Sequence, residues 1–287
     1  MAAPDARGHD ARVLVRPLRR RDRAGALQRL AGRGRSDLFL IDLAHQLGVG
    51  GDAAPELLGA WRGEALVGLA SVRPTLVLET ALEPAVEHAL VDALADAQSG
   101  LVRSESRSAA CAWQRLAANG RRALVDRLET QLVLEPGALR DVEAPRGVRI
   151  RPALVGDLDP LVEAARASLR EEGRPDPFLG DPKGFRRWVA ARLTRARVAE
   201  RAGLVAWVGY ADVRLREGHL LQGVYTWPAW RRRGFAAAGV AALCRAAFDA
   251  GATHVQLSVV EGNAAARALY AALGFAPHST LRTILFV

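Results

Sequence analysis

The sequence is poor in several residue types, and each shortage excludes a class of function. Its 287 residues include two cysteines, Cys111 and Cys244. Each lies in alanine-rich sequence without a second Cys or His at metal-ligand spacing, so we expect no metal site and interpret both as small buried residues. No apolar run reaches the ~18 to 20 residues of a membrane span, and the first residues lack the apolar core of a signal peptide. We therefore expect a cytoplasmic protein without membrane association.

Lysine is nearly absent, although the chain is strongly basic. The net charge is +9 with a pI near 10.8, and Lys183 is the only lysine, so arginine carries the charge. Such an excess favours phosphorylated ligands or polyanions as partners. The arginines are scattered among acids, however, and no aromatic residues alternate with them as a base-stacking surface requires. Nucleic acid is therefore not the expected partner, and a basic nucleic-acid-associated protein stays an alternative.

Two phosphate-binding signatures are missing, Gly-x4-Gly-Lys-Ser/Thr and Gly-x-Gly-x2-Gly, but a third arrangement is present. In "YTWPAWRRRGFAAAG", at 225–239, a strand ends at Pro228, three arginines lead to Gly234, and a helix begins. The first N–H groups of a helix have no internal partner and carry the positive end of its dipole, which suits an anion. Gly234 permits a positive φ and a close approach. The loop predicts a pyrophosphate or ribose-phosphate site, and the other interpretation is a solvated basic turn.

The chain repeats itself. "VLVRPLRRRD" at 13–22 and "VRIRPALVGD" at 148–157 share a short strand, a proline and an aspartate placed near a helix start, where its carboxylate can accept from free N–H groups. The intervening text, "LEPGALRDVEAPRGV", has two Pro and two Gly in fifteen residues and no periodicity. We predict two domains, 1–136 and 148–287, joined by a linker at 137–147.

The second half alternates strand and helix patterns, which predicts the α/β class with helices on the faces of a mixed sheet. The expected strands are 148–152, 196–201, 204–214, 219–227, 253–260 and 280–287, and the expected helices are 157–171, 183–194, 235–250 and 263–273.

The order of these motifs is specific in combination. Arg231-x-x-Gly234-x-Ala236 follows a strand, and Asn263, Tyr270 and a Gly-Phe pair come some thirty residues later. Over about 148–287 this resembles the Gcn5-related N-acetyltransferase (GNAT) superfamily. The resemblance implies two tandem GNAT-like domains, each a mixed, mostly antiparallel sheet flanked by helices, and acetyl-CoA as the acyl donor.

The resemblance also implies roles for particular residues. Tyr270 matches the tyrosine that protonates the departing thiolate. In the family, the strand end pairs with the pantetheine arm, the loop binds the pyrophosphate and the asparagine contacts the arm. The expected cofactor-binding residues are therefore Val224, Tyr225, Thr226, Arg231, Arg232, Arg233, Gly234, Phe235, Ala236 and Asn263.

Acyl transfer chemistry agrees with these roles, because it needs a neutral amine, a donor to the developing oxyanion and an acid for the sulfur. Other roles stay open: Tyr270 as a packing residue and Asn263 as a simple helix cap. No carboxylate or histidine lies within 220–227, so we name no general base. The candidates weighed, beside a water chain, are Glu171, Glu172, Asp212, Glu217 and His219.

The first half lacks this chemistry. Its counterpart of the arginine loop, "VLETALEPAVEHALVDAL", carries Glu79, Glu83 and Glu87 and no glycine, and its later helix has no matching tyrosine. It resembles the degenerate half of tandem acetyltransferase-like bacterial proteins. The predicted function is acetyl-CoA-dependent N-acetylation of a small-molecule or peptide amine. A noncatalytic acyl-CoA-binding regulatory module is the other alternative.

Overall fold

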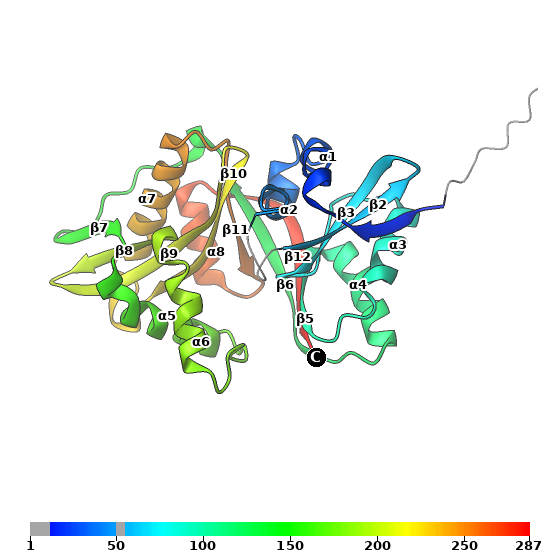
Figure 1. The fold of residues 1–287 in the computed structure, drawn as a ribbon. Coiled ribbons are helices and arrows are strands. Elements are labelled where there is room, and N and C mark those ends of the chain that lie inside the picture. Colours follow the sequence, from blue (N-terminus) through cyan, green and yellow to red (C-terminus); the bar gives the residue numbers. More distant parts are fainter. Residues whose placement is uncertain (1–11, 50–54) are drawn as a thin grey trace, which may run out of the picture. The chain divides into compact units, whose positions relative to one another are not determined.

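A computed structural model describes residues 12–49 and 55–287 of the chain, which form two compact units. Unit 1 takes its described residues from Met1–Ala31, Leu40–Asp126 and Leu281–Val287, and unit 2 consists of Gly32–Phe39 and Arg127–Thr280. Both contain sheets flanked by helices, which confirms the α/β class (Figure 1). Within the described ranges no helix is long and apolar enough to cross a membrane.

The two halves of the sequence build the same series of elements. The first half forms β1 (Leu14–Pro17), α1 (Arg23–Arg29), α2 (Gly34–His45), β2 (Glu56–Arg62), β3 (Ala65–Arg73), β4 (Val77–Leu78), α3 (Pro84–Leu94), β5 (Gly100–Glu105), α4 (Ser106–Ala118) and β6 (Ala123–Leu134). The second half forms β7 (Val148–Pro152), α5 (Leu158–Glu171), α6 (Pro182–Ala190), β8 (Ala196–Arg201), β9 (Leu204–Leu215), β10 (Gly218–Thr226), α7 (Phe235–Asp249), β11 (Val255–Val260), α8 (Ala264–Leu273) and β12 (Ala276–Phe286). This correspondence confirms the internal repeat.

The repeated motif makes the same contacts in both halves. Asp22 accepts two bonds of 3.0 Å from the Arg16 guanidinium and one of 2.9 Å from a backbone N–H three residues earlier. Asp157 accepts from Arg151 at 2.6 and 2.9 Å and from the equivalent N–H at 2.7 Å. These bonds favour the ionised carboxylates and lower the pKa of both aspartates. Each carboxylate accepts from a backbone N–H near the helix start, as predicted, but neither caps the α-helix that follows. An ion pair is added that ties strand to helix.

In unit 2 the strand order is β12-β6-β11-β10-β9-β8-β7, with β10 and β11 parallel and the other pairs from β6 to β7 antiparallel. Helices α7 and α8 pack on one face of this sheet around Trp207, and α5 and α6 pack on the other face around Phe185 (Figure 1). Close packing of α7 depends on Gly239, because a Cβ there would lie 2.4 Å from the Trp207 ring. The layers confirm the predicted mixed sheet.

Unit 1 has a sheet with the order β1-β2-β3-β4, all antiparallel. A single parallel bridge between Leu76 and Val102 joins the start of β4 to β5, and the end of β12 pairs with β5 from Leu281 to Phe286. Helices α3 and α4 cover the core cluster that contains Val102, Ile284 and Phe286.

Each unit is completed by a strand from the other half of the sequence. The later part of β6 lies in unit 2, where residues 129–134 pair with β11, and the last residues of β12 lie in unit 1. The compact units therefore do not follow the sequence halves 1–136 and 148–287. An alternating pattern indicates which face of a strand is buried but not which strand lies beside it, so this exchange has no signal in the sequence.

Most element boundaries of the second half agree with prediction within two residues. Two differ more: α6 ends at Ala190, before a short 3-10 turn at Leu193–Arg195, and β12 begins at Ala276 instead of 280. Cys244 is buried as predicted, but Cys111 is only half-buried.

Candidate functional site

The two parallel strands at the centre of unit 2 separate soon after they meet. β10 pairs with β11 only at His219↔Val255 and Leu220↔Gln256. Beyond this point β10 continues beside β9 to Thr226, and β11 continues beside β6 to Val260. The facing edges of the two strands do not pair with each other there, so their backbone groups are available to a ligand. We call this region the strand split.

Helix α7 begins directly after β10 without a side-chain cap. Its first residue is Phe235, its N-cap Gly234 has φ +81°, and the first internal bond is Ala238 N–H to Gly234 O at 3.1 Å. The N–H groups at 235–237 therefore lack helical partners and carry the positive end of the helix dipole. Gly234 is exposed, and the following alanines are small and partly exposed. The helix start has the form that the sequence predicted for an anion site.

The three arginines before Gly234 are exposed, and their surroundings differ. Arg231 donates from Nε to the Thr226 carbonyl at 3.0 Å and from Nη2 to both Glu171 oxygens at 2.7 and 2.8 Å. Arg232 has φ +61°, which is strained for a side chain with a Cβ, and the Arg233 guanidinium lies 5.6 Å from the centre of the Trp230 ring. The Arg231 side chain is thus directed back to β10 and α5. At the helix start Arg231 contributes through its backbone and not through its guanidinium.

The strand end is irregular where a ligand would run along it. The register of β10 against β9 shifts between Gln222 and Tyr225, and Gly223 within the shift has φ +59°. A Cβ at Gly223 would lie 2.9 Å from the Tyr210 ring. Val224 packs with the α7 side and Tyr225 with the α5 and α6 side. Val224 and Tyr225 therefore point to opposite faces, as consecutive residues of a strand do, and the backbone of 224–226 lies at the strand split. A lone glycine in a strand pattern signals such a bulge, and sequence reasoning missed it.

Helix α8 carries the two remaining predicted residues. Asn263 caps it, since its side chain accepts from Ala266 N–H at 3.1 Å. Tyr270 is buried, with 6 % of its surface exposed, and its ring lies edge-on to Phe275 at 5.6 Å. Burial is the main cause of the raised pKa of Tyr270, so the hydroxyl keeps its proton through the neutral range. The packing role of Tyr270 and the capping role of Asn263 are both present, and neither conflicts with the predicted chemistry.

Three of the five residues considered as general bases pair with arginines. Glu171 pairs with Arg231, Glu172 with Arg127 at 3.0 Å, and Asp212 with Arg192. The backbone carbonyl of Glu217 accepts from Thr253, and His219 is buried, with a pKa that burial lowers. Of these side chains, only Glu171 contacts the loop after β10.

In unit 1 the three predicted glutamates each have a local role. Glu79 is fully buried and accepts from Arg29 at 2.7 Å, Glu83 pairs with the Arg62 guanidinium, and buried Glu87 accepts from Ser108. The arginine loop of unit 2 has no counterpart there.

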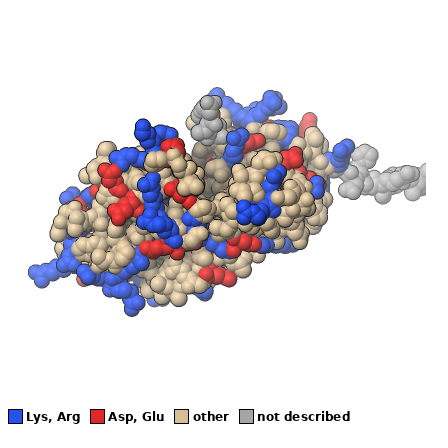
Figure 2. All heavy atoms as spheres, turned by 90° about the horizontal axis from the view of Figure 1, so that it is seen from below, with Lys and Arg blue, Asp and Glu red and all other residues tan. Residues whose placement is uncertain are grey.

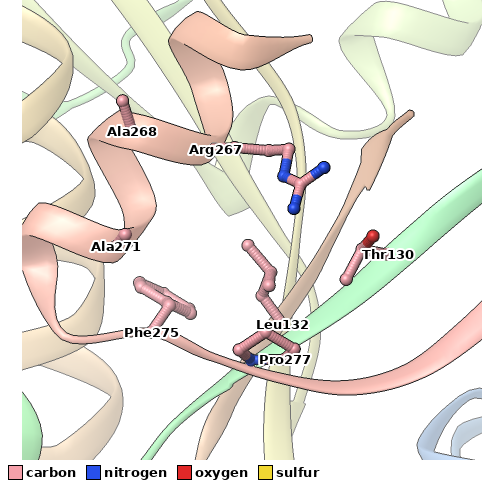
Figure 3. A pocket seen from close by; sticks show the side chains of 7 residues that line it. All are labelled: Thr130, Leu132, Arg267, Ala268, Ala271, Phe275 and Pro277. Carbon is pink, nitrogen blue, oxygen red and sulfur yellow. The ribbon is translucent and has the colours of Figure 1, made fainter. Parts of the chain in front are cut away.

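A hollow of about 300 Å³ lies beside α8 in unit 2. Figure 3 shows Arg267 reaching over it toward Thr130, with Leu132, Phe275 and Pro277 below. None of the predicted site residues lines this hollow, so it is separate from the strand split. On the face seen in Figure 2, basic side chains occur in separate groups with acidic ones among them.

The geometry agrees with comparisons to known proteins. Residues 160–275 match the family model described as the acetyltransferase (GNAT) family. The segment belongs to the GNAT family. It contains the strand split, the uncapped start of α7 and the whole of α8. A search of the curated proteins finds none that matches the chain.

Solved structures extend the GNAT fold to the entire chain. A Drosophila protein is 14% identical, with a TM-score of 0.72, covering 95% of this chain and 98% of its own. A GCN5-related N-acetyltransferase from Sphaerobacter thermophilus is 18% identical, with a TM-score of 0.60 and 95% of each chain covered. A tandem GNAT protein from the clavulanic acid biosynthesis pathway is 15% identical, with a TM-score of 0.56, covering 96% of this chain and 97% of its own. The tandem GNAT-like architecture predicted from the repeat is confirmed.

Proposed function

We propose that unit 2 is an acetyl-CoA-dependent N-acetyltransferase that transfers the acetyl group directly to an amine. The observation that supports it best is the strand split followed at once by the uncapped start of α7. A thioester arm needs a strand edge for its amides, and a pyrophosphate needs free N–H groups, so one elongated ligand uses both.

The residues present suit this ligand. The N–H groups at 235–237 and the exposed backbone around Gly234 would hold the pyrophosphate, with Arg232 and Arg233 supplying positive charge. The backbone of 224–226 would pair with the pantetheine arm. Asn263, at the start of α8, would border the same arm.

In the reaction, the amine nitrogen attacks the thioester carbonyl carbon and forms the C–N bond. The oxyanion of the tetrahedral intermediate accepts from a strand-end N–H. Collapse breaks the C–S bond, and the thiolate takes the proton of the Tyr270 hydroxyl. The attacking nitrogen loses its extra proton to water, and solvent returns a proton to the Tyr270 phenolate. Burial raises the pKa of Tyr270, which keeps the hydroxyl protonated at neutral pH and also makes it a weaker acid.

Unit 1 is proposed to be a degenerate GNAT-like domain that does not bind acetyl-CoA. Its helix start carries glutamates, which would repel a pyrophosphate, and proline stands at the first position of α3.

The test is release of free CoA from acetyl-CoA over a panel of amines: spermidine, glucosamine, free lysine and a short peptide with a free N-terminus. We expect amine-dependent release with at least one class of acceptor. Tight binding of acetyl-CoA without release would instead support the regulatory acyl-CoA-binding module, and salt-sensitive DNA or RNA binding that acetyl-CoA leaves unchanged would support the nucleic-acid alternative.

A further inference from the structure

Three side chains form a closed cluster where α5, β10 and the arginine loop meet. Tyr225 donates its hydroxyl to Glu171 Oε1 at 3.0 Å. Arg231 donates to both oxygens of the same carboxylate at 2.7 and 2.8 Å, and its Nε holds the Thr226 carbonyl at 3.0 Å. Glu171 is the last residue of α5, so the cluster joins the helix on one face of the sheet to the loop that leads to α7.

The direction of the Tyr225 hydrogen bond is fixed by chemistry. An ionised carboxylate accepts hydrogen bonds and cannot donate, so the hydroxyl proton is committed to Glu171. The phenol oxygen can then only accept hydrogen bonds, and because Arg231 also interacts with this hydroxyl, one of its two lone pairs is left for a further donor. It therefore favours a partner with an N–H, and it disfavours a partner that presents only an oxygen lone pair.

The cluster also balances its own charge. The positive charge of Arg231 compensates the negative charge of Glu171. The Arg231 guanidinium is also held by the Thr226 carbonyl. An approaching group therefore meets a neutral hydroxyl at this position. Tyr225 is 7 % exposed and Glu171 is exposed, so the hydroxyl lies at the border between core and solvent.

The position of Tyr225 connects the cluster to the proposed reaction. It is the penultimate residue of β10, at the strand split, and its side chain packs with α5 and α6 while Val224 packs toward α7. The ring thus lies on the face of the sheet opposite the helix whose start would bind the pyrophosphate.

We propose that the Tyr225 hydroxyl oxygen accepts a hydrogen bond from the N–H of the acceptor amine, and that Glu171 is the positioning residue that orients this hydroxyl. The inference rests on the proposed acetyltransferase function. Through its side chain, Tyr225 would then select acetyl acceptors that carry an N–H group. This role is separate from any contact of its backbone with the acyl donor.

The kinetic test compares Tyr225→Phe with Tyr210→Phe. Tyr210 lies in the same buried cluster on the neighbouring strand, so the two variants lose the same atom from similar surroundings. With the amine of the panel that turns over fastest, Tyr225→Phe should raise the KM for the amine about tenfold, and the KM for acetyl-CoA should stay within about twofold. Equal KM values for the amine in the two variants would overturn the proposal.

The positioning role of Glu171 has a pH-dependent readout. Glu171→Ala leaves Arg231 without its carboxylate, and the uncompensated charge should repel the ammonium form of the amine. The KM for the amine should therefore fall more steeply with rising pH than in the wild type. The double variant Glu171→Ala/Arg231→Ala removes both charges and should return the slope to that of the wild type. A purely structural role predicts the same slope in all three proteins.

A third readout does not depend on turnover. The chain has three tyrosines, so labelling at ¹³Cζ gives three signals that the Tyr→Phe variants assign. Adding the same amine to the complex with CoA should shift the Tyr225 signal and not that of Tyr210. If the wild type releases CoA with an amine but this signal does not move, only the present inference fails. If no amine supports release, the proposed function itself fails.

Discussion

Units 1 and 2 contain the same order of elements but differ where their two central parallel strands meet. In unit 2 the strands β10 and β11 separate after two residue pairs, and their facing backbone groups are left to a ligand. In unit 1 the corresponding strands meet at the Leu76–Val102 bridge, and there the next free N–H, of Leu78, donates to the buried Ser104 hydroxyl at 2.9 Å. Unit 1 thus pairs, with one of its own side chains, a strand N–H of the kind that unit 2 leaves to a ligand.

The helix starts differ in the same sense. Helix α7 begins after Gly234, whereas α3 begins with Pro84, which has no N–H to offer, after Glu83. On the following helices, the residue seven positions after the N-cap is Tyr270 in unit 2 and buried Ala112 in unit 1. On the proposed function, a few such substitutions separate the unit that binds acetyl-CoA from the unit that does not.

The strongest test of this comparison asks whether unit 2 stands without the first half. A chain of residues 138–287 lacks β6, which lies beside β11 and supplies buried Leu132 and Leu134 to the core around Trp207. We expect this fragment to fail to fold, because β11 would present an unpaired edge and the core two cavities. Circular dichroism and thermal melting measure this. A cooperative melt of the fragment alone would show that the strand exchange is dispensable.

Tyr270→Phe removes the hydroxyl, which unit 1 also lacks at the matching position, and keeps the ring. If the hydroxyl protonates the thiolate, turnover should fall by about 100-fold or more with little change in acetyl-CoA affinity, as for an interaction made in the transition state. The loss should be smaller for acyl donors whose thiol has a lower pKa. Wild-type turnover in this variant would leave Tyr270 as a packing residue.

Gly234→Val closes the helix start. Gly234 has φ +81°, and a Cβ there lies 3.2 Å from Pro145 Cγ, so valine should obstruct the loop and weaken acetyl-CoA binding by more than about 1.4 kcal/mol, or tenfold. Gly251→Val is the matched control, because Gly251 has φ +83° just beyond the other end of α7 with open space around it. Calorimetry with the two variants separates backbone strain from loss of the site, and equal affinities would remove the loop from the site.

Ser104→Ala removes the side chain that accepts from the Leu78 N–H in unit 1. The Leu78 N–H would lose its buried acceptor, which should lower the free energy of unfolding by about 1–3 kcal/mol. No second acetyl-CoA should bind, because the helix start is still acidic. Denaturant melts and the calorimetric stoichiometry check both parts, and a stoichiometry of two per chain would contradict the view of unit 1 as degenerate.

The smallest effect concerns pH. Burial raises the pKa of Tyr270 above its ordinary value of about 10, so the acid should stay protonated until the pH passes that value. Turnover should rise with pH as the amine loses its proton, and then level off without a fall up to about pH 10. A descending limb between about pH 8 and 9 would point to a different proton donor.

Local chemistry made much of this predictable from sequence. Pro228, Gly234 and Gly274 mark ends of elements through backbone preferences that act within a few residues, and the helix start of α7 followed from them. The exchange of β6 and β12 could not be foreseen, because strand partners are chosen by the packing of the entire unit. The Glu171–Arg231 pair joins residues sixty positions apart, and no spacing rule connects them.

The strand exchange has a consequence for synthesis on the ribosome. Unit 1 contains most of the first 126 residues, yet it also includes Leu281–Val287, most of which pair with β5. At about 5–20 residues per second, the intervening residues 127–280 take roughly 8 to 30 seconds to make. During that interval β5 waits for its neighbour with an open edge. The nascent chain therefore cannot complete its first unit until residues 281–287 have emerged.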